Sequence, residues 1–85
     1  KILNTQILTN LDKYNKIFIK TFSVSKLKLK KLKYESVPQW DSVGHMSMVG
    51  ELEDAFKISL DMDDIIDFSS YEKGKKILKK YKITF

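Results

Sequence analysis

The sequence predicts an all-α fold, a single domain over residues 1–85 with three long helices and one short helix. Three observations lead to this prediction. Apolar residues recur at steps of three and four along most of the chain, which is the spacing of one helix face. Serine or aspartate stands where the later stretches begin, and both residues favour helix starts. A hydrophobic content of 42% is enough for one modest core in a chain of 85 residues.

The first helix is predicted over residues 2–22, about five turns. One face would carry apolar residues at helical spacing throughout. These residues are Leu3, Ile7, Leu11, Tyr14, Phe18 and Phe22.

Residues 23–40 form an ambiguous segment in which Leu27, Leu29 and Leu32 alternate with lysines. Such alternation is also typical of a β-strand. No second strand-like run lies nearby to pair with it, so we expect a long loop pinned by Leu32 and Val37. A strand is the alternative.

The remaining chain predicts three helices. Asp41 or Ser42 caps the second, which ends near Lys57. Acidic residues lead a short third helix over residues 61–67, as the helix dipole favours. Ser69 or Ser70 caps the last helix. The apolar residues of the second helix are Met46, Val49, Leu52 and Phe56. Those of the last helix are Tyr71, Ile77, Leu78 and Tyr81.

The net charge of +5 hides three blocks of different sign. Residues 1–40 hold nine Lys and two acids, a net charge of +7; residues 41–72 hold one Lys and nine acids, −8; residues 73–85 hold six Lys and no acid, +6. All sixteen basic residues are Lys, so the bidentate fork of Arg that reads guanine is missing. The acidic block begins at Asp41.

Composition excludes several kinds of site. With no cysteine, the chain has no disulfide, thiolate metal site or cysteine nucleophile. Neither a membrane-spanning run nor a signal-peptide pattern is present, so we expect an intracellular, cytoplasmic protein. A chain this short rarely builds a deep catalytic cavity, and we expect no enzyme activity, no catalytic residue and no metal site.

Ser42 is the strongest candidate functional residue, because a serine at a helix start exposes its hydroxyl where the helix dipole favours an attached phosphate. Its plainer role would be a simple helix cap. A hydrolase pair with His45 would need an orienting acid and an oxyanion hole, so we expect His45 to face solvent. The aspartates of residues 61–67 lack the glycine and glutamate of an EF-hand loop, which leaves a solvated or partner-facing helix.

The run Trp40-Asp41-Ser42-Val43-Gly44-His45-Met46, followed by Leu52-Glu53-Asp54-Ala55-Phe56, resembles the acyl carrier and peptidyl carrier proteins. The resemblance extends from Leu32 to about Tyr81. It implies an acyl-carrier-like four-helix bundle and a 4′-phosphopantetheine arm, transferred from coenzyme A to Ser42.

The resemblance also implies roles for five residues in binding partner enzymes. Asp41 would be read beside the arm, Val43 and Met46 would make apolar contacts near it, and Glu53 and Asp54 would dock on basic surfaces. In this chain, Val43 replaces the more usual leucine, Ser47 a residue that is often acidic, and Gly50 a larger apolar residue.

The resemblance thus implies a monomeric carrier that presents acyl or aminoacyl groups as thioesters in a specialised biosynthetic pathway. Its partners would be a phosphopantetheinyl transferase, a loading ligase and downstream acyl-processing enzymes, with no nucleic acid and no membrane span. The alternative is a small basic helical module that binds proteins or nucleic acid through its lysines.

Overall fold

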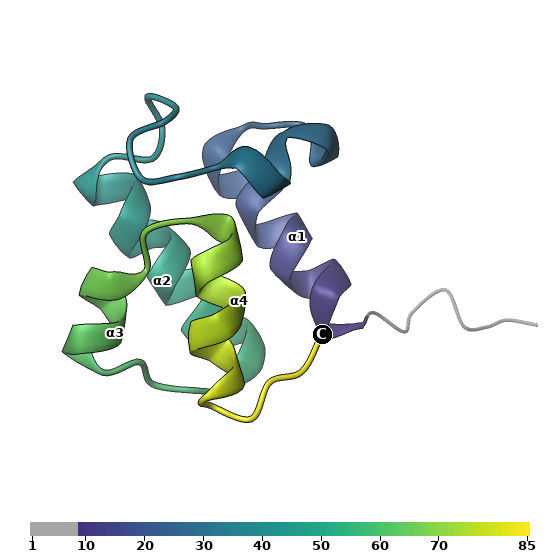
Figure 1. Ribbon diagram of the computed structural model, residues 1–85, viewed down its shortest axis with the longest axis vertical. Coiled ribbons are helices and arrows are strands. Elements are labelled where there is room, and N and C mark those ends of the chain that lie inside the picture. Colours follow the sequence, from purple (N-terminus) through teal and green to yellow (C-terminus); the bar gives the residue numbers. More distant parts are fainter. Residues whose placement is uncertain (1–8) are drawn as a thin grey trace, which may run out of the picture.

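Four α-helices and one short 3-10 helix form the computed structural model, which describes residues 9–85 (Figure 1). In chain order they are α1 (Asn10–Phe22), η2 (Lys26–Lys31), α2 (Ser42–Phe56), α3 (Met62–Asp67) and α4 (Tyr71–Lys79). Over residues 9–85 no strand forms, and extended pairing is limited to an isolated antiparallel bridge between Lys33 and Ser70. The all-α prediction is confirmed for this range. None of its helices is long and apolar enough to cross a bilayer.

Helix α1 starts directly after Thr9, later than predicted. The Thr9 hydroxyl accepts a hydrogen bond from the Asp12 N–H at 3.1 Å, and the Asp12 carboxylate accepts one from the Thr9 N–H at 3.2 Å. This reciprocal capping box satisfies two donors that would otherwise lack partners and fixes the helix start. A continuous helix through Thr9 is therefore wrong. The predicted positions Leu3 and Ile7 lie outside the described residues.

The core is formed mainly by aromatic side chains of α1 and the residues that cover them. Tyr14, Phe18 and Phe22 are fully buried at four-residue spacing, as predicted. Trp40 is also fully buried and stacks on Phe22, with ring centroids 4.7 Å apart and an interplanar angle of 12°. Trp40 therefore closes the core beneath the loop that precedes α2.

Helix η2 corrects the prediction of an irregular loop. In a 3-10 helix, residues three apart lie above one another. Leu29 and Leu32 share the buried side at 2% and 3% exposure, whereas Leu27 lies on another side at 93% exposure. The segment in which leucines alternate with lysines therefore contains a 3-10 helix and not a strand. Leu32 is buried and Val37 is half-buried, as expected.

The other three helices form where predicted, and their caps explain why. The Asp41 carboxylate accepts from the Gly44 N–H at 2.8 Å, so Asp41 and not Ser42 caps α2. Lys57 ends α2 in the left-handed region, with φ 57°. Ser70 caps α4 by accepting from the Lys73 N–H at 2.9 Å.

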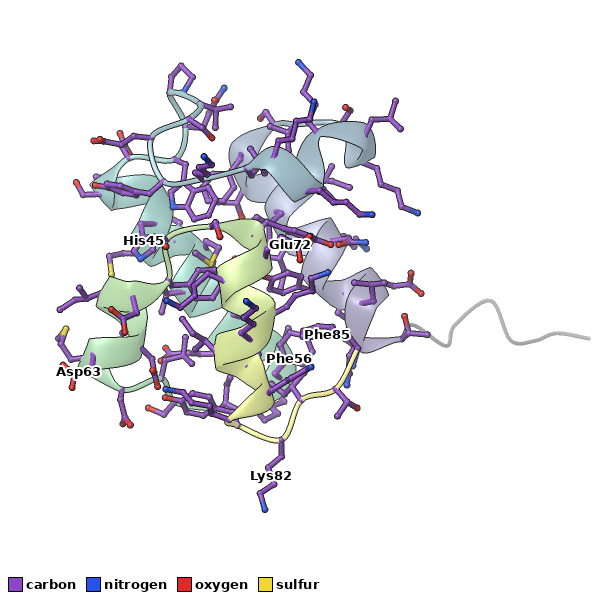
Figure 2. The ribbon with its side chains drawn as sticks, viewed as in Figure 1. His45, Phe56, Asp63, Glu72, Lys82 and Phe85 are labelled. Carbon is purple, nitrogen blue, oxygen red and sulfur yellow. The ribbon has the colours of Figure 1, made fainter. Side chains whose placement is uncertain are left out.

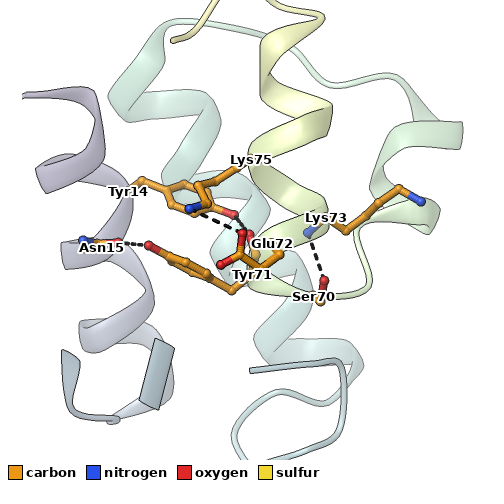
Figure 3. Close-up of polar contacts among 7 residues, drawn as sticks. All are labelled: Tyr14, Asn15, Ser70, Tyr71, Glu72, Lys73 and Lys75. Atoms are coloured by element: carbon orange, nitrogen blue, oxygen red, sulfur yellow. Dashed lines mark hydrogen bonds and ion pairs between the residues drawn. The ribbon is translucent and has the colours of Figure 1, made fainter. Parts of the chain in front are cut away.

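Helices α1 and α4 are joined by polar contacts inside the aromatic core (Figure 3). The Tyr14 hydroxyl donates to the Tyr71 carbonyl at 2.7 Å, and the Tyr71 hydroxyl donates to the Asn15 side chain. Burial, together with nearby Tyr71 and Glu72, raises the pKa of Tyr14 far above the ordinary tyrosine value. The Tyr14 hydroxyl therefore stays neutral and links the two helices as a hydrogen-bond donor.

Candidate functional site

Ser42 is the first residue of α2 and is exposed. Because Asp41 provides the cap, the Ser42 hydroxyl is not needed for capping. The preceding loop passes very close to the first turn: a Cβ added to Gly44 would lie 1.9 Å from the Gln39 carbonyl oxygen. Glycine at this position lets the loop fold back over the helix, which leaves Ser42 at an accessible edge.

An apolar hollow of about 350 Å³ lies beside Ser42, between the start of α2 and helix α3. Its lining is mostly apolar, and Ser42 is one of the lining residues. The main apolar contributors are Tyr34, Met46, Met62, Ile65, Ile66 and Phe68. A group attached to the Ser42 oxygen would therefore find an apolar surface within reach, in contrast to an ordinary helix start facing water.

His45 does not face solvent as expected; it is half-buried between α2 and α3 (Figure 2). Its Nδ1 accepts from the Trp40 indole N–H at 2.9 Å, and its Nε2 lies 2.8 Å from the Ile65 carbonyl oxygen. Because Nδ1 accepts a hydrogen bond, it carries no proton, so Nε2 carries the ring proton and donates a hydrogen bond to the Ile65 carbonyl oxygen. With both nitrogens occupied, His45 is a structural link and is not free to activate Ser42.

The acidic helix α3 is attached to the end of α4 by Asp64, which is 6% exposed. The Asp64 carboxylate accepts from the Lys80 ammonium and from the Tyr81 hydroxyl, each at 2.5 Å. The expectation that these aspartates are solvated or partner-facing is therefore wrong for Asp64, whereas Asp63 and Asp67 are exposed. The hydrogen bond from Lys80, then that from Tyr81, lowers the pKa of Asp64.

Acid should weaken the attachment of α3 to the end of α4, and Asp64→Asn should remove this part of the pH dependence of stability. A carboxyl whose pKa is lower in the folded than in the unfolded protein stabilises the fold above its unfolded pKa of about 4, and this contribution is lost as pH falls through the folded pKa. We expect the variant to be less stable at pH 7 and to lose less stability between pH 5 and 2. Urea unfolding across that range measures both effects.

Asp63→Asn is the matched control for this experiment, because Asp63 is one residue away on the same short helix and points outward in Figure 2. Its pH profile should follow that of the unsubstituted protein. Equal profiles for Asp64→Asn and Asp63→Asn would contradict a structural role for Asp64.

The five residues expected to bind partners lie on or beside α2, but in different environments. Val43 and Met46 are 74% and 54% exposed and lie near Ser42. Asp41 is exposed while its carboxylate caps the helix. Asp54 is exposed, whereas the half-buried Glu53 accepts from the Leu60 N–H at 2.9 Å. Glu53 thus holds the α2–α3 connection, and Asp54 is the freer of the two carboxylates.

The contribution of α3 to this site was not predicted from the sequence. Met62 and Ile66 are 69% and 70% exposed and line the hollow opposite α2. Their spacing of four residues places them on one face of a helix. The other residues of this six-residue helix are three aspartates and Ile65, and so short a helix lacks the length to bury every apolar side chain, which was the available signal.

Comparison of the chain with protein-family models, with curated proteins and with solved structures found no match. Assignment of a function therefore rests on the residues of this chain.

Proposed function

We propose that this chain is an acyl carrier protein that bears a 4′-phosphopantetheine arm on Ser42. The observation that carries the proposal is the exposed Ser42 hydroxyl at the first residue of α2, free of the capping role and beside an apolar hollow. The order of the helices, with a short acidic α3 between the longer α2 and α4, supports an acyl-carrier-like bundle.

Attachment of the arm needs only an accessible hydroxyl on this chain. The Ser42 Oγ would attack the β-phosphorus of coenzyme A; a phosphate ester bond forms, and the pyrophosphate bond breaks to release 3′,5′-ADP. The transferase would supply the base that takes the serine proton and the divalent cation that stabilises the leaving group. His45 cannot be that base while both its nitrogens are hydrogen-bonded.

The attached phosphodiester would lie near the start of α2, where helix N–H groups favour negative charge by about 0.3–1 kcal/mol at an exposed site. The terminal thiol of the arm would hold acyl or aminoacyl groups as thioesters. The hollow supports this assignment because its carbon-rich lining is suited to the arm or to an apolar cargo.

Partner enzymes would bind the surface around Ser42. Val43 and Met46 offer exposed apolar contacts, and Asp41 and Asp54 offer negative charge. The net charge of −8 over residues 41–72 favours fast, salt-sensitive and weak encounters with basic surfaces. Weak binding suits a monomeric, cytoplasmic carrier that visits a transferase, a loading ligase and later enzymes in turn.

Incubation with coenzyme A and a promiscuous phosphopantetheinyl transferase tests the proposal. We expect intact-mass spectrometry to find one added phosphopantetheine group per chain. Ser42→Ala should abolish the adduct completely, because no other hydroxyl has this position at the start of α2.

Ser47→Ala is the matched control, since Ser47 is also exposed and lies on the same helix. It should be modified as fully as the unsubstituted chain. An unmodified protein with native helical content would contradict the proposal, and salt-dependent binding of the same sample to duplex DNA would favour the alternative basic module.

A further inference from the structure

Helix η2 presents an exposed leucine among lysines. Leu27 is 93% exposed, the most exposed of the large hydrophobic residues in the described range. With three residues per turn, Leu27 and Lys30 lie on one edge of η2, and Lys28 and Lys31 lie on the next. We define the η2 ridge as the exposed residues Lys26, Leu27, Lys28, Lys30, Lys31 and Lys33.

The η2 ridge is held in place by the third side of the same helix. Leu29 is 2% exposed, and Leu32, directly after η2, is 3% exposed. The Leu32 carbonyl also accepts from the Tyr71 N–H at 3.0 Å, which ties the end of the ridge to the start of α4. Leu27 is therefore fixed outside the core by its neighbours and is not a residue of a loose loop that could fold inward.

The ridge carries concentrated positive charge. Five lysines occur within residues 26–33 without an acidic residue, and Figure 2 shows nitrogen-tipped side chains extending outward around η2. Within residues 9–85, the ion pairs that form involve Lys75 and Lys80 and leave these five lysines unpaired. Their charge is available to an external anionic partner.

We propose that the η2 ridge docks this protein on an anionic lipid bilayer, with Leu27 entering the interface and the surrounding lysines contacting lipid phosphates. Lysine ammonium groups bind such surfaces as point charges without a fixed geometry. An exposed leucine gains free energy only where it leaves water, which a bilayer interface offers. A nucleic-acid backbone offers the charge but no hydrocarbon, so it does not explain Leu27.

Docking through η2 leaves the Ser42 site accessible. Helix η2 packs beside α1, whereas α3, which forms one wall of the hollow, lies across the molecule from it in Figure 1. The anionic surface would also repel the negative charge of residues 41–72, so the protein would bind with these residues facing away from the bilayer. This inference does not depend on the function proposed for Ser42.

Vesicle co-sedimentation of the full chain tests the proposal. We expect binding to vesicles of phosphatidylcholine mixed with phosphatidylserine, little binding to phosphatidylcholine alone, and weaker binding as salt rises. Replacing Lys26, Lys28 and Lys30 with Gln should lower the partition coefficient on the order of a hundredfold, since each lysine near the surface contributes a factor of roughly five. Leu27→Ser should lower it roughly tenfold.

Replacing Lys76, Lys79 and Lys82 with Gln is the matched control, because it removes the same charge elsewhere; Lys82 projects from the opposite end of the molecule in Figure 2. This variant should lose far less affinity, and Ser42→Ala should lose none. All exchanged residues are exposed, so circular dichroism should be unchanged.

Three results would overturn the proposal: no binding to the anionic vesicles, equal losses for the two lysine triples, or full binding by Leu27→Ser. Binding to duplex DNA that is stronger than binding to vesicles and insensitive to Leu27→Ser would assign the ridge to nucleic acid instead. If the protein does not bind vesicles but is modified normally at Ser42, the docking proposal fails while the carrier function stands.

Discussion

Gly74→Ala should destabilise the protein by about 1–3 kcal/mol, although alanine is the better helix former. Gly74 is buried on α4, where an added Cβ would lie 2.2 Å from Phe68 Cζ and 2.3 Å from the Tyr14 hydroxyl oxygen. Both neighbours are fully buried and cannot move aside without disturbing the aromatic core. Urea unfolding followed by circular dichroism measures the change in free energy.

Gly50→Ala provides the matched control in the same chain. Gly50 is exposed on α2 and has no atom within 4 Å of an added Cβ. We therefore expect this substitution to stabilise the protein by about 0.5–1 kcal/mol. Stabilisation by both substitutions would show that the α1–α4 contact is looser than the structure indicates.

Trp40→Ala should cost about 3–5 kcal/mol, the usual loss for removing a large buried aromatic side chain. The substitution removes the ring that stacks on Phe22 and leaves Nδ1 of His45 without its donor. Domains of this length are stable by only about 4–13 kcal/mol, so the variant should be close to unfolding at 37 °C. Because Trp40 is the only tryptophan, unfolding must be followed by circular dichroism and not by fluorescence.

Two further variants test whether the loss of stability in Trp40→Ala comes from core packing and not from shortening any large side chain. Trp40→Phe keeps an aromatic ring in the cavity but lacks the N–H donor, so it should lose less stability than Trp40→Ala. Leu27→Ala removes a side chain that is 93% exposed and should change stability by less than about 0.5 kcal/mol. A small loss for Trp40→Ala, comparable to that for Leu27→Ala, would contradict the central role of Trp40 in the core.

Features determined by neighbouring residues were the predictable part of this fold. The helix periodicity of α1 and the caps of α2 and α4 depend on residues within four positions. The caps are confirmed, and the predicted apolar face of α1 is confirmed at Tyr14, Phe18 and Phe22 but not at Leu11, which is 37% exposed. The capping box of Thr9 was local as well and could have been predicted, because Asp12 stands three residues later. A continuous apolar pattern through Thr9 concealed it.

Features determined by distant partners were not predictable. Asp64 is buried because Lys80 and Tyr81, sixteen and seventeen residues away, meet its carboxylate. His45 leaves solvent because the Ile65 carbonyl, twenty residues away, accepts from its ring. A charged or polar side chain can be buried only where partners are supplied, and sequence spacing does not identify them.

In the candidate site, the sequence was enough to predict Ser42, Val43 and Met46 on α2, but the opposite wall of the hollow comes from α3. Whether two helices enclose an apolar space depends on how the second is oriented. That orientation follows from the bonds made by His45 and Asp64, which are long-range contacts.

Helix α3 has only six residues, too few for a helix to persist by its own backbone hydrogen bonds. At its start, the Asp61 N–H donates to the Tyr81 hydroxyl at 2.9 Å. In its middle, the Ile65 carbonyl accepts from His45. Directly after it, the Ser69 carbonyl accepts from the Tyr34 N–H at 2.9 Å. The width of the space beside Ser42 therefore depends on these polar links as well as on Phe68, the core residue directly after α3 that also lines the hollow.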